Sequence, residues 1–479
     1  MPWPALADLA AFIGVCYAGR AMREVGLNSR RFGFVTALAL GAALVFVGCK
    51  KGEGPAEVEA ITLMGNAVRG GLNSQMAEWY EEVLPEVGRE LGFPVRYVSA
   101  GVPDQDFKAR AALDIKSGKG PDIINLDQFW IPEFAEAGFL LPLDPYWNAW
   151  PDRSQYYAGV QAMGQYRGRT YTVVWNADLR LIYYHRAILE AAGIALPWQP
   201  KNWEEIFAAC RKIKAKMPEV TPLQLDAGVE MGEATTMQGF YMVLLGAGGK
   251  LYDFNDRKWI VAGPALDQAV NFYERLYRLE KLADADLQLS AKARDKSFER
   301  FQRGRIAIYV EGTWFYTSVL DPAGPWGIAD RDERIGWAWM PGSGGPGMPE
   351  KVSISGGDGL VINPNTKQPD RAWQVIAALN TVERQARLFA KRASTPTRRD
   401  LAALPEVQKN RFIAETAEAL LPITLSRPGL PEYNEVSFQV QLLTERVVSG
   451  EKTGAEALAE FAAAVKQVVG EENTKALPP

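Results

Sequence analysis

Short apolar runs, bounded by polar or turn-forming residues, predict strands over residues 60–64, 94–99 and 122–126. Apolar residues spaced three and four apart predict helices between and after these strands. The helical segments are residues 76–84, 107–116, 132–137, 202–213, 264–277, 369–380 and 455–469. Strands separated by helices are typical of an α/β protein with mostly parallel sheets.

Local chemistry places two helix starts and one thiol. Asn202 fits an N-cap, and Glu205 follows it at the spacing of a capping box. Pro264 suits the first turn of another helix. Cys210 falls on the same apolar stripe as Ile206, so we expect a buried core thiol.

Residues 32–48 form one uninterrupted apolar segment, with Arg30 and Arg31 before it and Cys49 after it. A basic start, an apolar stretch and a small residue before a cleavage site are the pattern of a secretory signal. Residues 45–49 resemble a bacterial lipobox, so we predict lipidation at Cys49. The alternatives are an uncleaved membrane helix, for which this segment is barely long enough, and a twin-arginine export signal.

Composition and charge exclude several function classes. The formal net charge is −4 and no long basic block is present, so we do not expect a nucleic-acid partner. The cysteines are Cys16, Cys49 and Cys210, without a CxxC motif, which argues against zinc and dithiol sites. His185 is the single histidine, and we expect it to be structural. We therefore expect neither a metal nor a cofactor.

Five segments resemble, in order and spacing, the family 1 extracellular solute-binding proteins, which include the maltose-binding type. They are residues 120–146 (GPDIINLDQFWIPEFAEAGFLLPLDPY), 168–189 (GRTYTVVWNADLRLIYYHRAIL), 193–206 (GIALPWQPKNWEEI), 301–319 (FQRGRIAIYVEGTWFYTSV) and 353–379 (SISGGDGLVINPNTKQPDRAWQVIAAL). The resemblance implies a two-lobed periplasmic-binding-protein (Venus flytrap) fold, in which three crossings join the lobes and the ligand lies between them.

The resemblance also implies a division of the chain and a set of partners. The crossings are expected near residues 168–173, 306–310 and 358–361. The parts are a signal segment (1–48, with Met22 as a possible start), a lipidated N-terminus and linker (49–57), a first lobe (58–170 and 308–360), a second lobe (171–307 and 361–470) and a tail (471–479). A monomeric receptor subunit of an ABC importer, held at the outer face of the membrane by its lipid, would bind a mono- or oligosaccharide and deliver it to a permease. Polyols and sugar phosphates are the alternative ligands.

A sugar offers hydroxyl groups and apolar ring faces, so its site needs carboxylates, amides or arginines together with aromatic faces. Open parallel sheets bind ligands beyond the carboxyl ends of their strands, and the candidates follow predicted strands or crossings. They are Asn66, Arg69, Asp127, Gln128, Trp130, Trp175, Asn176, Asp178, Thr236, Gln238, Tyr241, Glu311, Gly312, Trp314, Gly357, Asp358, Arg427 and Tyr433. For Trp130, Trp175 and Tyr241 the alternative is a place in the hydrophobic core.

Trp314 is the candidate for stacking on a sugar ring. Gly312 allows the backbone to turn or approach closely just before it, and Glu311 could accept hydrogen bonds from hydroxyls. The competing interpretation makes Trp314 a core residue.

An enzyme has little support in the sequence, and we expect a binding protein. The chain lacks a GxSxG elbow, a GxxxxGK[ST] loop and an HExxH motif. A two-carboxylate glycosidase leaves no fixed spacing, and its acids would come from Asp127, Asp178, Glu311 and Asp358. A lipid-anchored surface protein without a small ligand is the third class.

Overall fold

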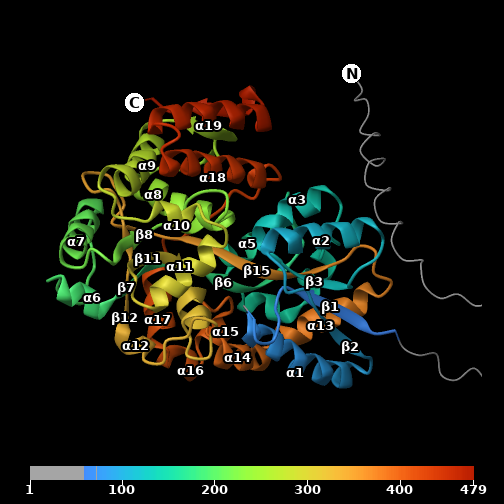
Figure 1. The fold of residues 1–479 in the computed structure, drawn as a ribbon. Coiled ribbons are helices and arrows are strands. Elements are labelled where there is room, and N and C mark those ends of the chain that lie inside the picture. The colour runs from blue at the N-terminus through green and yellow to red at the C-terminus, as the bar shows by residue number, and fades with distance from the viewer. Residues whose placement is uncertain (1–58, 72, 479) are drawn as a thin grey trace, which may run out of the picture. The chain divides into compact units, whose positions relative to one another are not determined.

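The structure is a computed structural model that describes residues 59–71 and 73–478 (Figure 1). The predicted signal segment and the predicted lipidation site at Cys49 lie outside the described residues. Among the helices within these two ranges, none combines the length and the hydropathy needed to span a bilayer.

The first lobe is built on a six-stranded sheet. Its strands are β1 (Ile61–Gly65), β2 (Val95–Ser99), β3 (Ile123–Asp127), β6 (Val173–Asp178), β15 (Ile354–Ile362) and β16 (Leu425–Ser426). The pairs β1–β2 and β1–β3 are parallel. β15 runs antiparallel to both β3 and β6, so a late segment of the chain lies between two early strands.

The second lobe is built on a four-stranded sheet in the order β12-β7-β11-β8. Its strands are β7 (Arg180–His185), β8 (Thr221–Gln224), β11 (Ile306–Gly312) and β12 (Ile335–Ala338). β7 and β11 are buried along their whole length. This matches the continuous apolar character of strands covered on both faces. The prediction of mostly parallel sheets is nevertheless wrong, because β7 runs antiparallel to β11 and β12 in the second sheet and β15 runs antiparallel in the first.

Helices cover both sheets. In the first lobe, α1 (Ser74–Leu91) buries the predicted apolar stripe, and α13 (Pro369–Leu379) and α14 (Val382–Lys391) pack against it. In the second lobe, α9 (Pro264–Glu274), α18 (Tyr433–Ser449) and α19 (Gly454–Val469) pack together, and Figure 1 shows them at one end of the molecule.

The other elements are short or connect these layers. The remaining helices are α2 (Asp104–Lys116), α3 (Ile131–Glu136), α4 (Asp144–Ala149), α5 (Ala158–Ala162), α6 (Arg186–Ala191), α7 (Trp203–Lys216), α8 (Tyr241–Gly246), α10 (Ala285–Gln288), α11 (Ala293–Gln302), α12 (Arg331–Arg334), α15 (Arg399–Ala402), α16 (Pro405–Lys409) and α17 (Arg411–Leu420). The remaining strands are β4 (Gln165–Tyr166), β5 (Arg169–Thr170), β9 (Tyr252–Asp253), β10 (Lys258–Ala262), β13 (Met340–Pro341), β14 (Lys351–Val352) and β17 (Thr474–Ala476).

Local predictions agree with the structure. Asn202 caps α7 by accepting a hydrogen bond from the Glu205 N–H at 3.0 Å. Cys210 is fully buried, and Pro264 is the first residue of α9. His185 is 4% exposed, its Nε2 lies 2.6 Å from the Phe301 carbonyl, and burial lowers its pKa to about 4. The imidazole is therefore a neutral structural group.

The positions of the crossings differ from the sequence expectation. The chain leaves the first sheet at Leu179, the one residue between β6 and β7, and returns to it at Ser353, just before β15. Residues 306–310 lie wholly within the second sheet and residues 358–361 wholly within the first. An apolar run predicts a strand, but it does not tell which of two sheets the strand joins.

The expected lobe boundaries change accordingly. β12 was expected in the first lobe, yet it pairs with β7 in the second sheet. α13 and α14 were expected in the second lobe, yet they pack on α1 in the first. The differences have two causes. Residues 306–310 do not cross, so β12 stays in the second lobe, and the crossing at Ser353 leads into the first sheet, so α13 and α14 follow in the first lobe.

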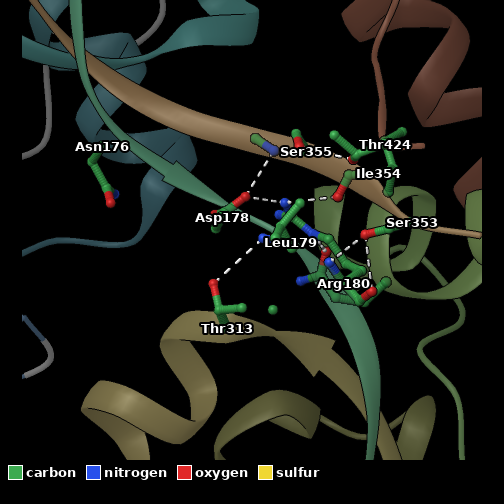
Figure 2. Close-up of polar contacts among 12 residues, drawn as sticks. Asn176, Asp178, Leu179, Arg180, Thr313, Ser353, Ile354, Ser355 and Thr424 are labelled. Atoms are coloured by element: carbon green, nitrogen blue, oxygen red, sulfur yellow. Dashed lines mark hydrogen bonds and ion pairs between the residues drawn. The ribbon is translucent and has the colours of Figure 1, made fainter. Parts of the chain in front are cut away.

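The two crossing segments lie side by side and are joined by hydrogen bonds (Figure 2). Ser353 Oγ accepts from the Arg180 N–H and donates to the Arg180 carbonyl, both at 3.0 Å. One residue before Arg180, Leu179 is bonded to Thr313: the Leu179 N–H donates to Thr313 Oγ1, and the Leu179 carbonyl accepts from the Thr313 N–H. Asp178 Oδ1 accepts from the Gly356 N–H at 2.7 Å and pairs with the Arg180 guanidinium. These contacts fix how the two strands pass from lobe to lobe.

Replacing Ser353 with Ala is expected to lower the free energy of unfolding by about 1–3 kcal/mol, because two buried backbone groups of Arg180 lose their partner. Ser154→Ala is the control, since its hydroxyl is exposed and bonds only the Pro151 carbonyl; its effect should stay within about 0.5 kcal/mol. Urea denaturation measures both. Equal effects of the two variants would show that the Ser353 contacts do not stabilise the crossing.

Candidate functional site

A small hollow lies where the two lobes meet, beside the crossing strands. Its empty space, counted together with the adjoining open solvent, is about 180 Å³. One wall comes from β6, one from the turn after β11 and one from the segment after α14. The lining residues are Asn176, Ala177, Asp178, Thr313, Trp314, Thr317, Arg392 and Ser394. Hydroxyl, amide, carboxylate, guanidinium and indole groups therefore converge on one space from both lobes.

Three of the residues predicted from the sequence, Asn176, Asp178 and Trp314, line this hollow. A fourth, Asp358, lies at the same edge because its Oδ2 accepts a hydrogen bond from Asn176 Nδ2 at 3.0 Å. Burial raises the pKa of Asp358, and the nearby charge of Arg392 opposes this shift. The predicted amide and carboxylates thus come together although they lie on different strands.

Trp314 is half-buried, so it agrees in part with the stacking interpretation and in part with the core interpretation. Its ring makes edge contacts with Phe298 and Phe315, at centroid distances of 6.0 and 6.3 Å, and the Arg294 guanidinium lies 4.9 Å from its centroid. A Cβ at Gly312 would lie 2.2 Å from the indole Nε1, so this position needs a residue without a side chain. Trp314 therefore packs against the core on one side and borders the hollow on the other.

Glu311 lies behind Trp314 rather than in the lining. It is fully buried, with Oε1 3.8 Å from Arg294 Nε and Oε2 accepting from the Gly312 N–H at 3.1 Å. Burial raises the pKa of Glu311, and the charge of Arg294 opposes the shift. Burial likewise raises the pKa of the neighbouring Asp226. Glu311 thus holds the arginine that covers Trp314, and the predicted direct contact with ligand hydroxyls is not supported.

A second group of predicted residues gathers around Arg427, which is 5% exposed. Its guanidinium donates to Asp127 Oδ1 and to Glu233 Oε1, each at 3.1 Å, and lies 4.0 Å from the centre of the Phe129 ring. Tyr433 donates to the same Glu233 oxygen at 2.6 Å. Arg427 therefore joins the end of β3 in the first lobe to a carboxylate of the second lobe.

The candidates around the π-helical turn of residues 235–240 are engaged in this framework. Thr236 Oγ1 lies 2.7 Å from Ser437 Oγ, and Gln238 Oε1 accepts from Arg180 Nε at 3.3 Å. Tyr241 is 4% exposed and belongs to the hydrophobic core. Neither Thr236 nor Gln238 lines the hollow, so they support the residues that do.

Asn66 and Arg69 form local contacts away from the hollow. The Asn66 amide donates to the Val102 carbonyl at 2.8 Å and accepts from the Val102 N–H at 3.1 Å. Arg69 forms an exposed ion pair with Glu81. Both side chains therefore have their partners within the first lobe.

Two predicted tryptophans are core residues, as the alternative for each allowed. Trp130 is 3% exposed, and Trp175 is 5% exposed and donates to Asn125 Oδ1 at 2.8 Å. The neighbouring Gln128 is also buried. Gly357 acts through the backbone, because a Cβ there would lie 2.2 Å from the Asn176 carbonyl oxygen. β6 and β15 approach closely at this point for that reason.

Sequence reasoning missed Arg392 and Ser394, which line the hollow from the first lobe. Arg392 ends α14 directly after Lys391, and basic residues at a helix C-terminus are ordinary surface features. Glu233 was missed as well, although it binds both Arg427 and Tyr433. The only local signal was the polar segment 394–397 after a helix, which is equally typical of a loop.

Comparisons with known proteins agree with this architecture. A maltotriose-binding protein of Pyrococcus abyssi (strain GE5 / Orsay) is 26% identical over 263 residues, covering 53% of this chain and 49% of the relative. An ABC transporter solute-binding protein of Thermotoga lettingae, solved with α-D-tagatose, superposes with a TM-score of 0.74 at 24% identity, over 86% of this chain and 100% of that one. The maltose-bound T. maritima MalE3 gives 0.73 at 20% identity, over 86% and 100%.

The family comparison covers most of the described chain. Residues 72–386 match the family model described as bacterial extracellular solute-binding protein. This range contains both crossings that Figure 2 shows and all of the hollow's lining except Arg392 and Ser394. The protein belongs to the bacterial extracellular solute-binding protein family.

Proposed function

We propose that this protein is the solute-binding subunit of an ABC importer and that it binds a mono- or oligosaccharide in the hollow between its lobes. The observation that carries the proposal is the lining itself, in which an indole stands among hydroxyl, amide and guanidinium groups from both lobes. The names of the similar proteins, which give maltotriose, tagatose and maltose, support the same ligand class.

The lining matches the two kinds of surface on a sugar. Trp314 offers an apolar face to a sugar ring, while Asn176, Thr313 and Thr317 offer hydrogen-bonding groups to its hydroxyls. Burying one aromatic face contributes roughly 1–3 kcal/mol, whereas micromolar affinity corresponds to about −8 kcal/mol. Contacts from both lobes are therefore needed, which couples affinity to lobe closure.

The size of the hollow supports a closing mechanism. It has no room for a water-sized sphere, whereas ordinary ligand pockets measure ~300–1,000 Å³. We infer that the lobes separate to admit a ligand and close over it, with Leu179 and Ser353 as hinge positions. The lobes that we propose follow sheet membership, with residues 59–178, 354–398 and 425–426 in the first and 180–352, 411–424 and 427–476 in the second.

The contacts of the candidate catalytic carboxyl groups support a binding role without catalysis. A glycosidase needs two carboxyl groups free to act on the scissile bond. Asp127 is paired with Arg427 and Asp178 with Arg180, while Glu311 lies behind Trp314. Incubating the protein with maltotriose and following cleavage products tests this, and we expect none above the background without protein.

The ligand class is tested by thermal shift and calorimetry on the full chain purified in detergent. The probes are maltose, maltotriose, D-tagatose, D-glucose, ribitol and glucose 6-phosphate. At least one neutral sugar is expected to bind with saturation. If all these probes leave both the melting temperature and the heat of mixing unchanged, the proposed function is wrong.

Trp314→Ala is expected to reduce affinity for the best sugar of this panel at least tenfold, because the stacking face is lost. Some loss of stability is also expected, since the ring packs on Phe298. Trp326→Ala is the matched control: Trp326 is half-buried against the same Phe298 at 5.3 Å but does not line the hollow. Retained affinity in Trp314→Ala, or an equal loss in Trp326→Ala, would place stacking elsewhere.

Arg427→Met tests the ion pairs that join the lobes. It leaves the Asp127 and Glu233 carboxylates without their cation, so the free energy of unfolding should fall by at least ~2 kcal/mol. This value is below the cost of breaking a fully buried ion pair because the Asp127 side chain is 35% exposed. Arg69→Met is the control, because its pair with Glu81 is exposed and should contribute less than ~1 kcal/mol. Urea denaturation compares them, and equal losses would contradict a joining role for Arg427.

We further propose that the protein works outside the cytoplasm, anchored by a lipid on Cys49, and passes its ligand to a membrane permease. The apolar segment 32–48 before Cys49 supports this. Cys49→Ala should move the protein from the membrane fraction to the soluble or secreted fraction, as immunoblotting of fractionated cells would report. Unchanged membrane association in the variant would instead support an uncleaved helix.

A further inference from the structure

Four arginines lie in or around the hollow, and their partners differ. Arg180 is paired with Asp178, Arg294 faces Glu311, and Arg427 binds Asp127 and Glu233. For Arg392, no hydrogen bond or ion pair of the guanidinium is present within residues 59–71 and 73–478. Its Nε is buried without a hydrogen-bond partner, as are the Nε atoms of Arg294 and Arg427, but those two guanidinium groups have carboxylate partners. Arg392 is also the arginine of this set that lines the hollow.

Arg392 is half-buried, but its Nε is fully buried, and a buried donor without a partner is costly. The guanidinium can gain acceptors from a group bound in the space that the side chain borders. That space is the hollow, and Ser394 and Asn176 border it beside Arg392. Asp178 lines the hollow together with Arg392, and Asp358 lies at its edge through its hydrogen bond with Asn176, but neither acid forms an ion pair with Arg392 among the described residues. A group bound there would therefore lie between a cation and two acids.

The chemistry of that group follows from this arrangement. It must accept hydrogen bonds from the guanidinium and also donate to, or at least not repel, the two carboxylates. A hydroxyl does both, because it carries one donor and two acceptor positions. A carboxylate or phosphate only accepts, and its charge would add to two acids already present.

We propose that Arg392 is a ligand-binding residue that recognises hydroxyl oxygens of a neutral ligand, and that the acids beside it select against anionic sugars. This rests on the proposed function, because it names the chemistry of the same site. Asp358 and Asp178 accept hydrogen bonds from the same hydroxyl groups to which Arg392 donates. Two neighbouring hydroxyls of the ligand are therefore recognised together. Sugar acids and sugar phosphates are then weak ligands.

The test uses a charge series on the full chain in detergent: D-glucose, D-glucuronate, D-galactose and D-galacturonate, with the best neutral sugar of the earlier panel. In the wild type, each acid should bind at least tenfold more weakly than its neutral parent. Arg392→Gln should weaken the best neutral sugar at least tenfold, and Arg392→Lys should retain part of the affinity. Calorimetry measures the dissociation constants.

Arg387→Gln is the matched control, because Arg387 lies on the same helix, α14, and pairs with Glu86 at the surface. It should leave affinity within twofold. Thermal melting of each variant establishes that it is folded, and Arg392→Lys keeps the charge if Arg392→Gln does not fold.

Two results would overturn the proposal. The first is neutral-sugar affinity unchanged within twofold in both folded Arg392 variants. The second is tighter binding of the acids than of their neutral parents in the wild type, with that preference lost in Arg392→Gln, which would make Arg392 an anion receptor. If the wild type binds no sugar of either panel, the proposed function fails and this inference fails with it.

Discussion

The structure depends on two extended segments that enter or leave the first sheet without a loop, β6–β7 and β14–β15. One residue, Leu179, separates β6 from β7, and Ser353 stands immediately before β15. Because Ser353 satisfies both backbone groups of Arg180, the two passages are held together at the same level (Figure 2). The hollow lies beside them, and one of its three walls is β6 itself.

Buried ion pairs surround the hollow. Arg427 bridges Asp127 and Glu233 on one side, and Glu311 holds Arg294 over the indole of Trp314 on another. These buried pairs are poor evidence for stability, because desolvation offsets much of their attraction. Their clearer effect is to fix side-chain positions, which leaves Arg392 as the arginine in the lining of the hollow that has no carboxylate partner among the described residues.

The sequence predicted the elements well and their assembly less well. The apolar runs at 60–64 and 122–126 correspond to β1 (Ile61–Gly65) and β3 (Ile123–Asp127), because burial on both faces leaves a local pattern. The sheet that a strand joins leaves no such local pattern in the sequence. Residues 306–310 and 358–361 were therefore expected at crossings, but each segment lies inside a single sheet.

The residues of the candidate site were likewise predicted only in part. Asn176, Asp178 and Trp314 could be found because they follow predicted strands. Trp130 and Trp175 satisfy the same rule and are buried, since the sequence does not say which side of a strand end is open. Arg392 could not be found, because its distinguishing property is the lack of a partner, which exists only once the lobes are assembled.

The place of β15 has a consequence for how the chain is made. This strand pairs with both β3 and β6, yet it is formed by residues 354–362, long after those two strands have been synthesised. Pairing between segments so distant in sequence is slow, because a long loop must close first. The first lobe therefore stays incomplete through most of translation. A polypeptide that lacks the strand joining β3 to β6 for so long cannot close its first sheet while the earlier residues emerge, so the order of synthesis and the order of assembly differ.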